Sequence, residues 1–444
     1  MSAVQLFRRF SAVLALACLL FAAGCTDDSF FSYNGDANSG NFSTTVFLGD
    51  SYTAGFMNGS LCDKFQPNSW PALVAKQAGF TINQPLVASP GAPNYYTLAL
   101  GSYTVPTNFG AFDNTYTNAV TQVTGTTTGR DSATLVPTNL AVPGATVSDI
   151  VNTKPVANPT TTQQLLTSYV LGAPLSGKSQ MNQAIAQNPT TIIIWAGVDD
   201  ALLADTGNNG AASVGSAAMP NPSTFLTNYT NLLTAITSVS NAHIILLNVP
   251  DVTQLPYMTS GASLSTSLGT TAFNKLGMAS GDLINATGAA LIPSVIGGSK
   301  AASVLTPYIM KAADVVTVQN NIGPSSSIGS SNTVSYNSVI NGLASEIGAT
   351  VVDMNLAFST WQTTPPTVTI SGTTYTPSFG YLGGLFSTDG IHPTATFQAF
   401  LANRVIDASN SKMGTSITKL TGANIGVIAA ADPLFGPNIG KVAF

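Results

Sequence analysis

The fold of this chain is decided by residues 45–56, which read TVFLGDSYTAGF. The opening run, TVFL, is short, apolar and rich in β-forming residues, which predicts a buried strand. Gly49, Asp50 and Ser51 follow it and lead into a predicted helix. A serine between a parallel strand and a helix exposes its hydroxyl at the sheet edge, with its own N–H aimed at the same point. Ser51 is therefore a candidate nucleophile, although Asp50 and Ser51 are also the residue types that simply cap helices.

Four more short apolar runs continue this pattern, with helical patterns between them. They are Asn139 to Val142, Thr191 to Trp195, His243 to Val249 and Ala349 to Met354. Continuous apolar runs are typical of strands buried on both faces, and alternating strands and helices are typical of a parallel sheet. We therefore predict an α/β fold with a five-stranded parallel sheet.

Two long segments do not fit this alternation. Residues 84–133 and 254–334 contain scattered aromatic residues and clusters of Gly, Ser and Thr. Connections of this length usually form functional loops or small substructures, so we predict two insertions that decorate one end of the sheet as subdomains or a lid. The predicted domain spans residues 43–410, and the tail 411–444 carries no clear pattern.

The composition excludes several classes of protein. The 444 residues are 44% apolar and 7% charged, which excludes disorder driven by net charge. Only 14 Lys and Arg residues are present, and they form no basic cluster, so we expect no nucleic-acid partner. The length allows one large domain or two ordinary ones.

Residues 1–25 predict a processing signal. Two arginines precede the apolar run 10–21, which is too short to anchor the chain, because a membrane span needs about 20 residues. The signal ends in AAGC, which resembles the lipobox of bacterial lipoproteins and implies that Cys25 is diacylated. Residues 26–42 would then tether the domain to the bacterial cell envelope, at the outer membrane if the host has one. The alternative is cleavage at these small residues and release of a secreted protein.

Histidine is scarce, which narrows the choice of a catalytic base. A serine hydrolase needs a histidine base, and the chain contains only His243 and His392. His243 opens an apolar strand and is predicted to be structural. His392 precedes the last predicted helix, and Asp389 lies three residues before it, where a carboxylate can orient the imidazole. Two separated histidines without the Cys or carboxylate spacing of a zinc site make metal binding implausible, so we expect no metal and no cofactor.

Four motifs in order along the chain resemble the blocks of the GDSL, or SGNH, hydrolase family. Gly49-Asp50-Ser51 resembles the first block, residues 139–145 (NLAVPGA) the second, residues 197–200 (GVDD) the third, and Asp389-x-x-His392 the last. The resemblance covers about residues 44–410, outside the two insertions. It implies a three-layer α/β/α flavodoxin-like sandwich whose usual activity is ester hydrolysis.

The resemblance also implies a role for each motif residue. Ser51 would be the nucleophile, His392 the base and Asp389 the carboxylate that orients the base. The backbone N–H groups of Ser51 and Gly144, with the side chain at position 199, would form the oxyanion hole. Asp50 would be structural and brace the first turn.

Position 199 departs from the family pattern, because the family places Asn where this chain has Asp199. An ionised carboxylate only accepts hydrogen bonds, and the loss of one oxyanion donor costs about 10²–10³ in kcat. Three explanations are open. Asp199 stays protonated because burial and the adjacent Asp200 raise its pKa, another group donates instead, or the site binds a ligand without catalysis.

The leading interpretation is a lipid-anchored serine esterase or lipase that acts through an acyl-enzyme. Its substrate would be a small-molecule, lipid or glycan ester, and the lipid anchor would make the membrane its other partner. The acyl group, the alcohol and the oligomeric state are left open. The rival interpretation is a non-catalytic surface-binding lipoprotein on the same fold, motivated by Asp199 and the Thr- and Asn-rich insertions.

Overall fold

The computed structural model describes residues 42–98, 120–207, 213–324 and 334–435 of the 444-residue chain. The predicted signal segment, Cys25 and the predicted tether up to residue 41 lie outside the described residues. Within the described ranges, no helix is both long enough and apolar enough to cross a bilayer.

A parallel sheet of four strands forms the centre of the described chain. Its strands, in spatial order, are β1 (Thr45–Gly49), β4 (Thr191–Trp195), β5 (His243–Leu247) and β9 (Thr350–Val352). All neighbours are parallel, with Val46 opposite Ile192 and Ile245 opposite Thr350. β1 and β4 are buried along their whole length, which explains why their sequences are continuous apolar runs.

The expected fifth strand, Asn139 to Val142, is an irregular segment that lies along β1. It makes one parallel bridge, between Asn139 and Phe47, and the Leu140 N–H donates to the Phe47 carbonyl at 2.9 Å. The next bridge would need the Gly49 N–H, but this group donates to the side chain of Gln180 at 3.1 Å. The prediction of five strands is therefore corrected to four, because a side chain takes the donor that would extend the ladder.

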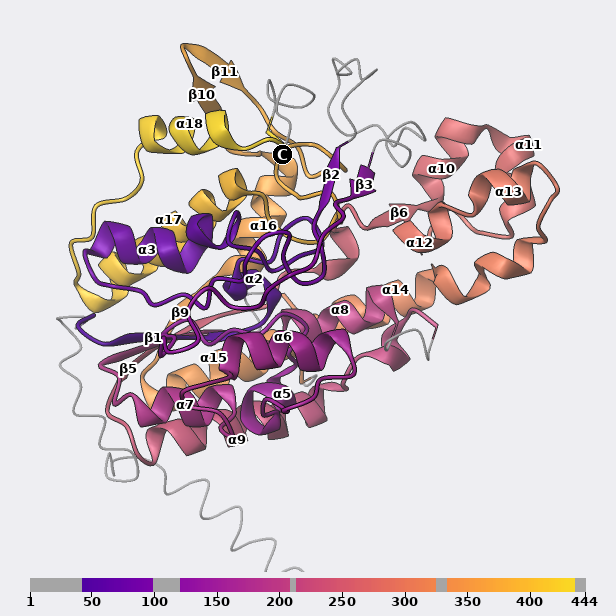
Figure 1. Cartoon of the computed structure of the whole chain (residues 1–444). Coiled ribbons are helices and arrows are strands. Elements are labelled where there is room, and N and C mark those ends of the chain that lie inside the picture. Colours follow the sequence, from indigo (N-terminus) through magenta and orange to yellow (C-terminus); the bar gives the residue numbers. More distant parts are fainter. Residues whose placement is uncertain (1–41, 99–119, 208–212, 325–333, 436–444) are drawn as a thin grey trace, which may run out of the picture. The chain divides into compact units, whose positions relative to one another are not determined.

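Helices cover both faces of the sheet, which fits an α/β/α arrangement. In Figure 1, α3 and α17 lie on one side of the strands, and α5, α7, α9 and α15 lie on the other. Their bounds are α3 (Trp70–Ala78), α5 (Val147–Asn152), α7 (Gln180–Ala186), α9 (Pro222–Thr237), α15 (Tyr336–Ile347) and α17 (Ala395–Met413). α17 packs against α3 and β9, while α9 packs against α5 and α15, so each face has its own helical layer.

The sequence of α9 shows why these helices form. Asn221 caps it by accepting from the Thr224 N–H, and Pro222 occupies its first turn. Phe225, Tyr229 and Ile236 are buried at helical spacing, so one apolar face packs on the sheet and the other faces water.

The two segments predicted as insertions contain short antiparallel sheets. In the first segment, β2 (Tyr96–Leu98) pairs with β3 (Val120–Gln122), and residues 99–119 lie outside the described part. In the second segment, β7 (Leu283–Asn285) pairs with β6 (Met258–Ser260) and with β8 (Ile309–Met310). Four helices accompany this sheet, drawn at the right of Figure 1: α10 (Gly261–Leu268), α11 (Thr270–Phe273), α12 (Ala286–Ala289) and α13 (Ile292–Ile296). They share a hydrophobic cluster of their own, which includes Leu264, Ile284 and Leu305.

The tail that carried no clear pattern continues the packed structure. α17 extends to Met413, and α18 (Gly422–Ala431) packs against α17 and against β10 (Val368–Ile370), which pairs with β11 (Thr373–Tyr375). The remaining helices are α2 (Ser51–Ala54), α6 (Thr162–Leu171), α8 (Val198–Thr206), α14 (Ala312–Ile322) and α16 (Met354–Thr363). Short 3-10 turns complete the described chain: η1 (Gln66–Asn68), η2 (Ser216–Ala218), η3 (Val252–Gln254), η4 (Asn274–Leu276) and η5 (Ala302–Tyr308).

Candidate active site

The carboxyl edge of the sheet brings the predicted site residues together. Ser51 begins α2 directly after β1, and Asp199 lies in the first turn of α8 after β4. Gly144 follows the irregular segment beside β1. These three residues and His392 line one cavity of about 480 Å³, a size typical of small-molecule sites. The position agrees with the rule that open α/β sheets bind ligands at the carboxyl ends of their strands.

Asp50 braces this edge of the sheet. Its Oδ1 accepts from the Tyr52 N–H at 3.2 Å, and its Oδ2 accepts from the N–H groups of Val198 and Asp199 at 3.2 and 3.3 Å. Burial, and then the nearby Asp199 carboxyl, raises the pKa of Asp50 well above its usual value. Asp50 thus ties the start of α8 to the turn that carries Ser51, and it is not among the residues that line the cavity.

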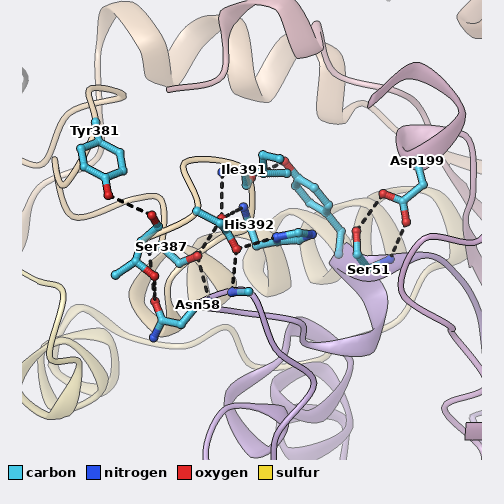
Figure 2. Close-up of polar contacts among 11 residues, drawn as sticks. Ser51, Asn58, Asp199, Tyr381, Ser387, Ile391 and His392 are labelled. Carbon is cyan, nitrogen blue, oxygen red and sulfur yellow. Dashed lines mark hydrogen bonds and ion pairs between the residues drawn. The ribbon is translucent and has the colours of Figure 1, made fainter. Parts of the chain in front are cut away.

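The carboxyl group of Asp199 accepts three hydrogen bonds from Ser51 and Gly144. Ser51 Oγ donates to Oδ1 at 2.9 Å, and the N–H groups of Ser51 and Gly144 donate to Oδ2 at 3.2 and 2.7 Å. Figure 2 shows the two contacts between Ser51 and Asp199. Two backbone N–H groups that converge on one oxygen are the arrangement that stabilises an oxyanion. In this structure Asp199 itself supplies that oxygen.

Burial raises the pKa of Asp199, while His392 and the donors from Ser51 and Gly144 oppose the rise. The adjacent Asp200 binds a different group, because its Oδ2 accepts from the Val147 N–H at 2.8 Å. Burial raises the pKa of Asp200 to about 7. Both carboxyl groups of the third motif therefore hold protons more tightly than an exposed aspartate does.

The imidazole of His392 is held by Asp389. Nδ1 donates to Asp389 Oδ2 at 2.8 Å, so that in the neutral ring Nε2 is the nitrogen with a lone pair. Nε2 is buried and has no hydrogen-bond partner in the described part of the chain. In Figure 2 the ring extends from its loop toward Ser51, whose hydroxyl is bonded to Asp199. Proton-transfer contacts are often unmade in empty sites and form when substrate binds.

Asp389 is ionised because donors surround it. Its Oδ1 accepts from Ser387 Oγ at 2.9 Å and from the N–H groups of Ile391 and His392 at 2.9 and 2.8 Å. Its Oδ2 also accepts from the Gly59 N–H at 3.0 Å. Burial alone would raise the pKa of this carboxyl, but His392 and the hydrogen bonds lower it to about 2. The carboxylate is therefore charged at every physiological pH.

Residues just after Ser51 bind the histidine loop, the segment 387–393 that carries His392, and the sequence analysis did not predict this link. Tyr52 Oη donates to the Ile391 carbonyl at 2.7 Å. The side chain of Asn58 accepts from the N–H and hydroxyl of Thr388 at 3.2 and 3.1 Å. Asn58 has a φ of +56°, and the Asn-Gly pair that it begins is a turn signal in the sequence. That signal predicts the turn but not the loop that the turn binds.

Other candidate nucleophiles and bases lie away from this chemistry. His243 opens β5 and is therefore at the opposite end of the strand from the site. The thiol of Cys62 is buried, and burial raises its pKa to about 12, so it stays protonated and unreactive. Among the described residues, no three His, Cys, Asp or Glu side chains are grouped so that they could hold a metal ion.

The geometry agrees with a comparison to known protein families. The family model for the GDSL-like Lipase/Acylhydrolase matches residues 45–405. The match covers most of the chain, and the chain therefore belongs to the GDSL-like lipase/acylhydrolase family. A search of curated proteins found no match. Family membership supports a hydrolase of the lipase or esterase type.

Proposed function

We propose that this protein hydrolyses carboxylic esters with Ser51 as the nucleophile, His392 as the base and Asp389 as the carboxylate that orients the base. The observation that carries the proposal is that Ser51 and His392, far apart in sequence, line the same cavity. The hydrogen bond from His392 to an ionised Asp389 supports the role of the base, because it fixes the tautomer that leaves Nε2 able to accept a proton.

The reaction would proceed through an acyl-enzyme. Ser51 Oγ attacks the ester carbonyl carbon while its proton passes to His392 Nε2, and the carbonyl oxygen becomes an oxyanion bound by the N–H groups of Ser51 and Gly144. The bond to the alcohol oxygen then breaks, and His392 returns the proton to the departing alcohol. Water attacks the acyl carbon in the same way, His392 takes its proton and passes it to Ser51 Oγ, and the carboxylic acid leaves.

Asp199 must change state in this cycle, because its Oδ2 occupies the point where the oxyanion would sit. A protonated Asp199 would lose its charge, bind the two N–H groups more weakly and move aside for the substrate oxygen. It could then donate to the oxyanion, as neutral buried carboxyl groups do in other oxyanion holes. The raised pKa of Asp199 supports this state. We therefore expect activity to favour acid pH.

The cavity lining supports an uncharged substrate. Apolar side chains contribute much of the wall: Phe56, Pro93, Pro143, Leu166, Leu202, Leu203 and Ile391. Asp149 and Asp199 also line it, and no Lys or Arg does so among the described residues. An acyl chain fits such a wall better than a carboxylate or phosphate, which would lack a cationic partner.

The rival function is ligand binding without turnover, and one observation favours it. An ionised Asp199 fills the oxyanion position and turns the Ser51 hydroxyl away from His392. Such a site would bind a hydrogen-bond donor and leave esters intact.

The two functions are separated by labelling the full chain with a fluorophosphonate and assaying a chromogenic short-chain ester from pH 4 to 8. The proposal expects labelling and turnover that disappear in Ser51→Ala and persist in Ser411→Ala, a serine exposed on α17. A folded wild-type protein that is neither labelled nor active at any pH in this range would establish the binder.

We also propose that Cys25 carries the lipid that anchors the protein to the cell envelope. The lipobox-like sequence AAGC supports this. Expression in a bacterial host with an alkyne-tagged palmitate should label the wild-type protein and Cys62→Ala but not Cys25→Ala. A mature protein that is secreted without label would contradict the proposal.

A further inference from the structure

The proposed oxyanion hole is short of one donor whenever Asp199 is ionised. The N–H groups of Ser51 and Gly144 are present, but the side chain at position 199 is a carboxyl group where the family has an amide. Such a donor contributes about 10²–10³ to kcat. A second amide placed beside the same oxygen would restore the missing interaction.

Gln163 places an amide beside this hole. It lies in the first turn of α6, which Thr161 caps by accepting from the Gln164 N–H at 3.2 Å. Its side chain passes directly over the α-carbon of Gly144: a Cβ added at Gly144 would lie 2.3 Å from Gln163 Oε1 and 3.5 Å from Nε2. Gly144 has a φ of +80°, so only glycine lets the backbone N–H and this amide share the space.

The amide nitrogen of Gln163 has nothing to donate to. Nε2 is buried, and it has no hydrogen-bond partner in the described ranges. Burying an amide donor without an acceptor destabilises the folded state, and most buried donors in folded proteins are paired. The neighbouring Gln164 is different, because its Oε1 accepts from the Thr160 N–H at 2.8 Å. Gln163 also lines the cavity that contains Ser51 and His392, so a bound molecule can supply the missing acceptor.

We infer that Gln163 is a further catalytic residue, whose Nε2 donates to the carbonyl oxygen of the ester as that oxygen becomes the oxyanion. This rests on the proposed esterase function. Nε2 makes no hydrogen bond to Asp199 Oδ2, the oxygen that now receives the Gly144 N–H. The contact therefore forms only when the ester displaces that carboxyl group and the amide, which packs on Gly144, turns toward the new oxygen. The chain thereby replaces the amide lost at position 199 with one from α6.

The inference predicts a specific kinetic change. Gln163→Met keeps the length of the side chain and removes the donor, and kcat should fall about 10²-fold with little change in KM, because the lost contact forms in the transition state. Gln163→Glu should show a similar or larger loss. The matched control is Gln164→Glu, which adds the same charge one residue later and keeps the oxygen that accepts from Thr160; it should retain wild-type kcat. Circular dichroism and the melting temperature establish that each variant is folded.

A double-mutant cycle tests whether positions 163 and 199 serve the same oxygen. In an Asp199→Asn background the amide at 199 can donate, so Gln163→Met should cost about tenfold or less, and the two effects should be clearly non-additive. If wild type turns over esters but Gln163→Met keeps wild-type kcat, raises only KM, or acts additively with Asp199→Asn, the role of Gln163 is overturned while the proposed function stands. If wild type has no esterase activity and is not labelled at Ser51, the proposed function fails and takes this inference with it.

Discussion

The two halves of the site each centre on a buried aspartate that accepts several hydrogen bonds, yet the pKa values of the two carboxyl groups move in opposite directions. Asp389 accepts from an imidazole and four other donors, and its pKa falls to about 2. Asp199 accepts from three donors, and burial raises its pKa. The difference shows that hydrogen bonds lower a buried carboxyl pKa only when they outweigh the desolvation of the charge.

This contrast suits the two halves to different tasks. A carboxylate that stays ionised keeps the histidine in one orientation, whereas a carboxyl group that can hold a proton can lie beside an oxyanion without repelling it. Groups whose environments push their pKa values apart are typical of acid–base sites. Substitutions in each half, beside it, or in the cavity between the two halves should therefore have different effects.

The largest effect is expected from Asp389→Asn in the base half. The amide would turn an NH₂ group toward the Gly59 N–H and His392 Nδ1 or force the imidazole into the other tautomer, so kcat should fall about 10⁴-fold at every pH. Ester hydrolysis is the measurement, and Asp407→Asn, which removes an exposed ion pair with Lys419, is the matched control. Activity within tenfold of wild type would show that Asp389 does not orient the base.

The second prediction concerns stability, because burial raises the pKa of Asp200 and the free energy of unfolding therefore depends on pH. The folded state keeps a proton that the unfolded chain releases above about pH 4. This contribution is therefore fully present below pH 4 and is lost as the pH rises toward 7, the approximate pKa of Asp200 when folded. A rise of this size corresponds to about 4 kcal/mol in the free energy of unfolding.

Urea unfolding at pH 4.5 and 7.5 measures this loss. Asp200→Asn should reduce the difference between the two values, because the amide has no proton to lose and its oxygen can still accept from the Val147 N–H. Asp389 has the opposite sign, so its contribution should disappear only as the pH falls from about 4 to 2. A wild-type protein that becomes more stable from pH 4.5 to 7.5 would contradict the raised pKa values.

The third prediction is that turnover depends less on pH when Asp199 is replaced by a residue that cannot ionise. Asp199→Asn cannot ionise and can donate through its amide, so turnover at pH 7.5 should rise by about 10²-fold over wild type, with a smaller change at acid pH. The measurement is kcat against pH, and Asp407→Asn, which removes an exposed carboxylate on α17, should leave the profile of wild type unchanged. Lower turnover at every pH in Asp199→Asn would mean that a protonated Asp199 is not what supports catalysis.

The smallest effect concerns the cavity between the two halves. Leu203 lines the cavity from α8, and Leu203→Trp should reduce the space for an acyl chain. The ratio of kcat/KM for a butyrate ester to that for an acetate ester should fall about tenfold. Leu226→Trp, at an exposed position on α9, is the control. An unchanged ratio would place the acyl chain elsewhere.

Some parts of this arrangement could be read from the sequence because they depend on neighbouring residues. The apolar runs that form β1, β4 and β5 are continuous, and burial on both faces of a parallel sheet requires that. The contact between Asp389 and His392 spans three residues, so one turn brings it about. The fifth strand was predicted by the same logic, and it is irregular because of a distant side chain, Gln180.

The sequence alone determined the strand runs, the order of the four motifs and the anomalous aspartate at position 199. Only the tertiary structure decided that this aspartate fills the proposed oxyanion position, that the Asn58-Gly59 turn binds the histidine loop, and that Gln163 lies against Gly144 with an unused donor. The physical reason is the separation of the interacting residues along the chain. Apolar periodicity and turn chemistry depend on residues that are neighbours in the sequence. Hydrogen bonds between loops depend instead on how the strands and helices pack, and no local pattern encodes which distant partner a donor meets.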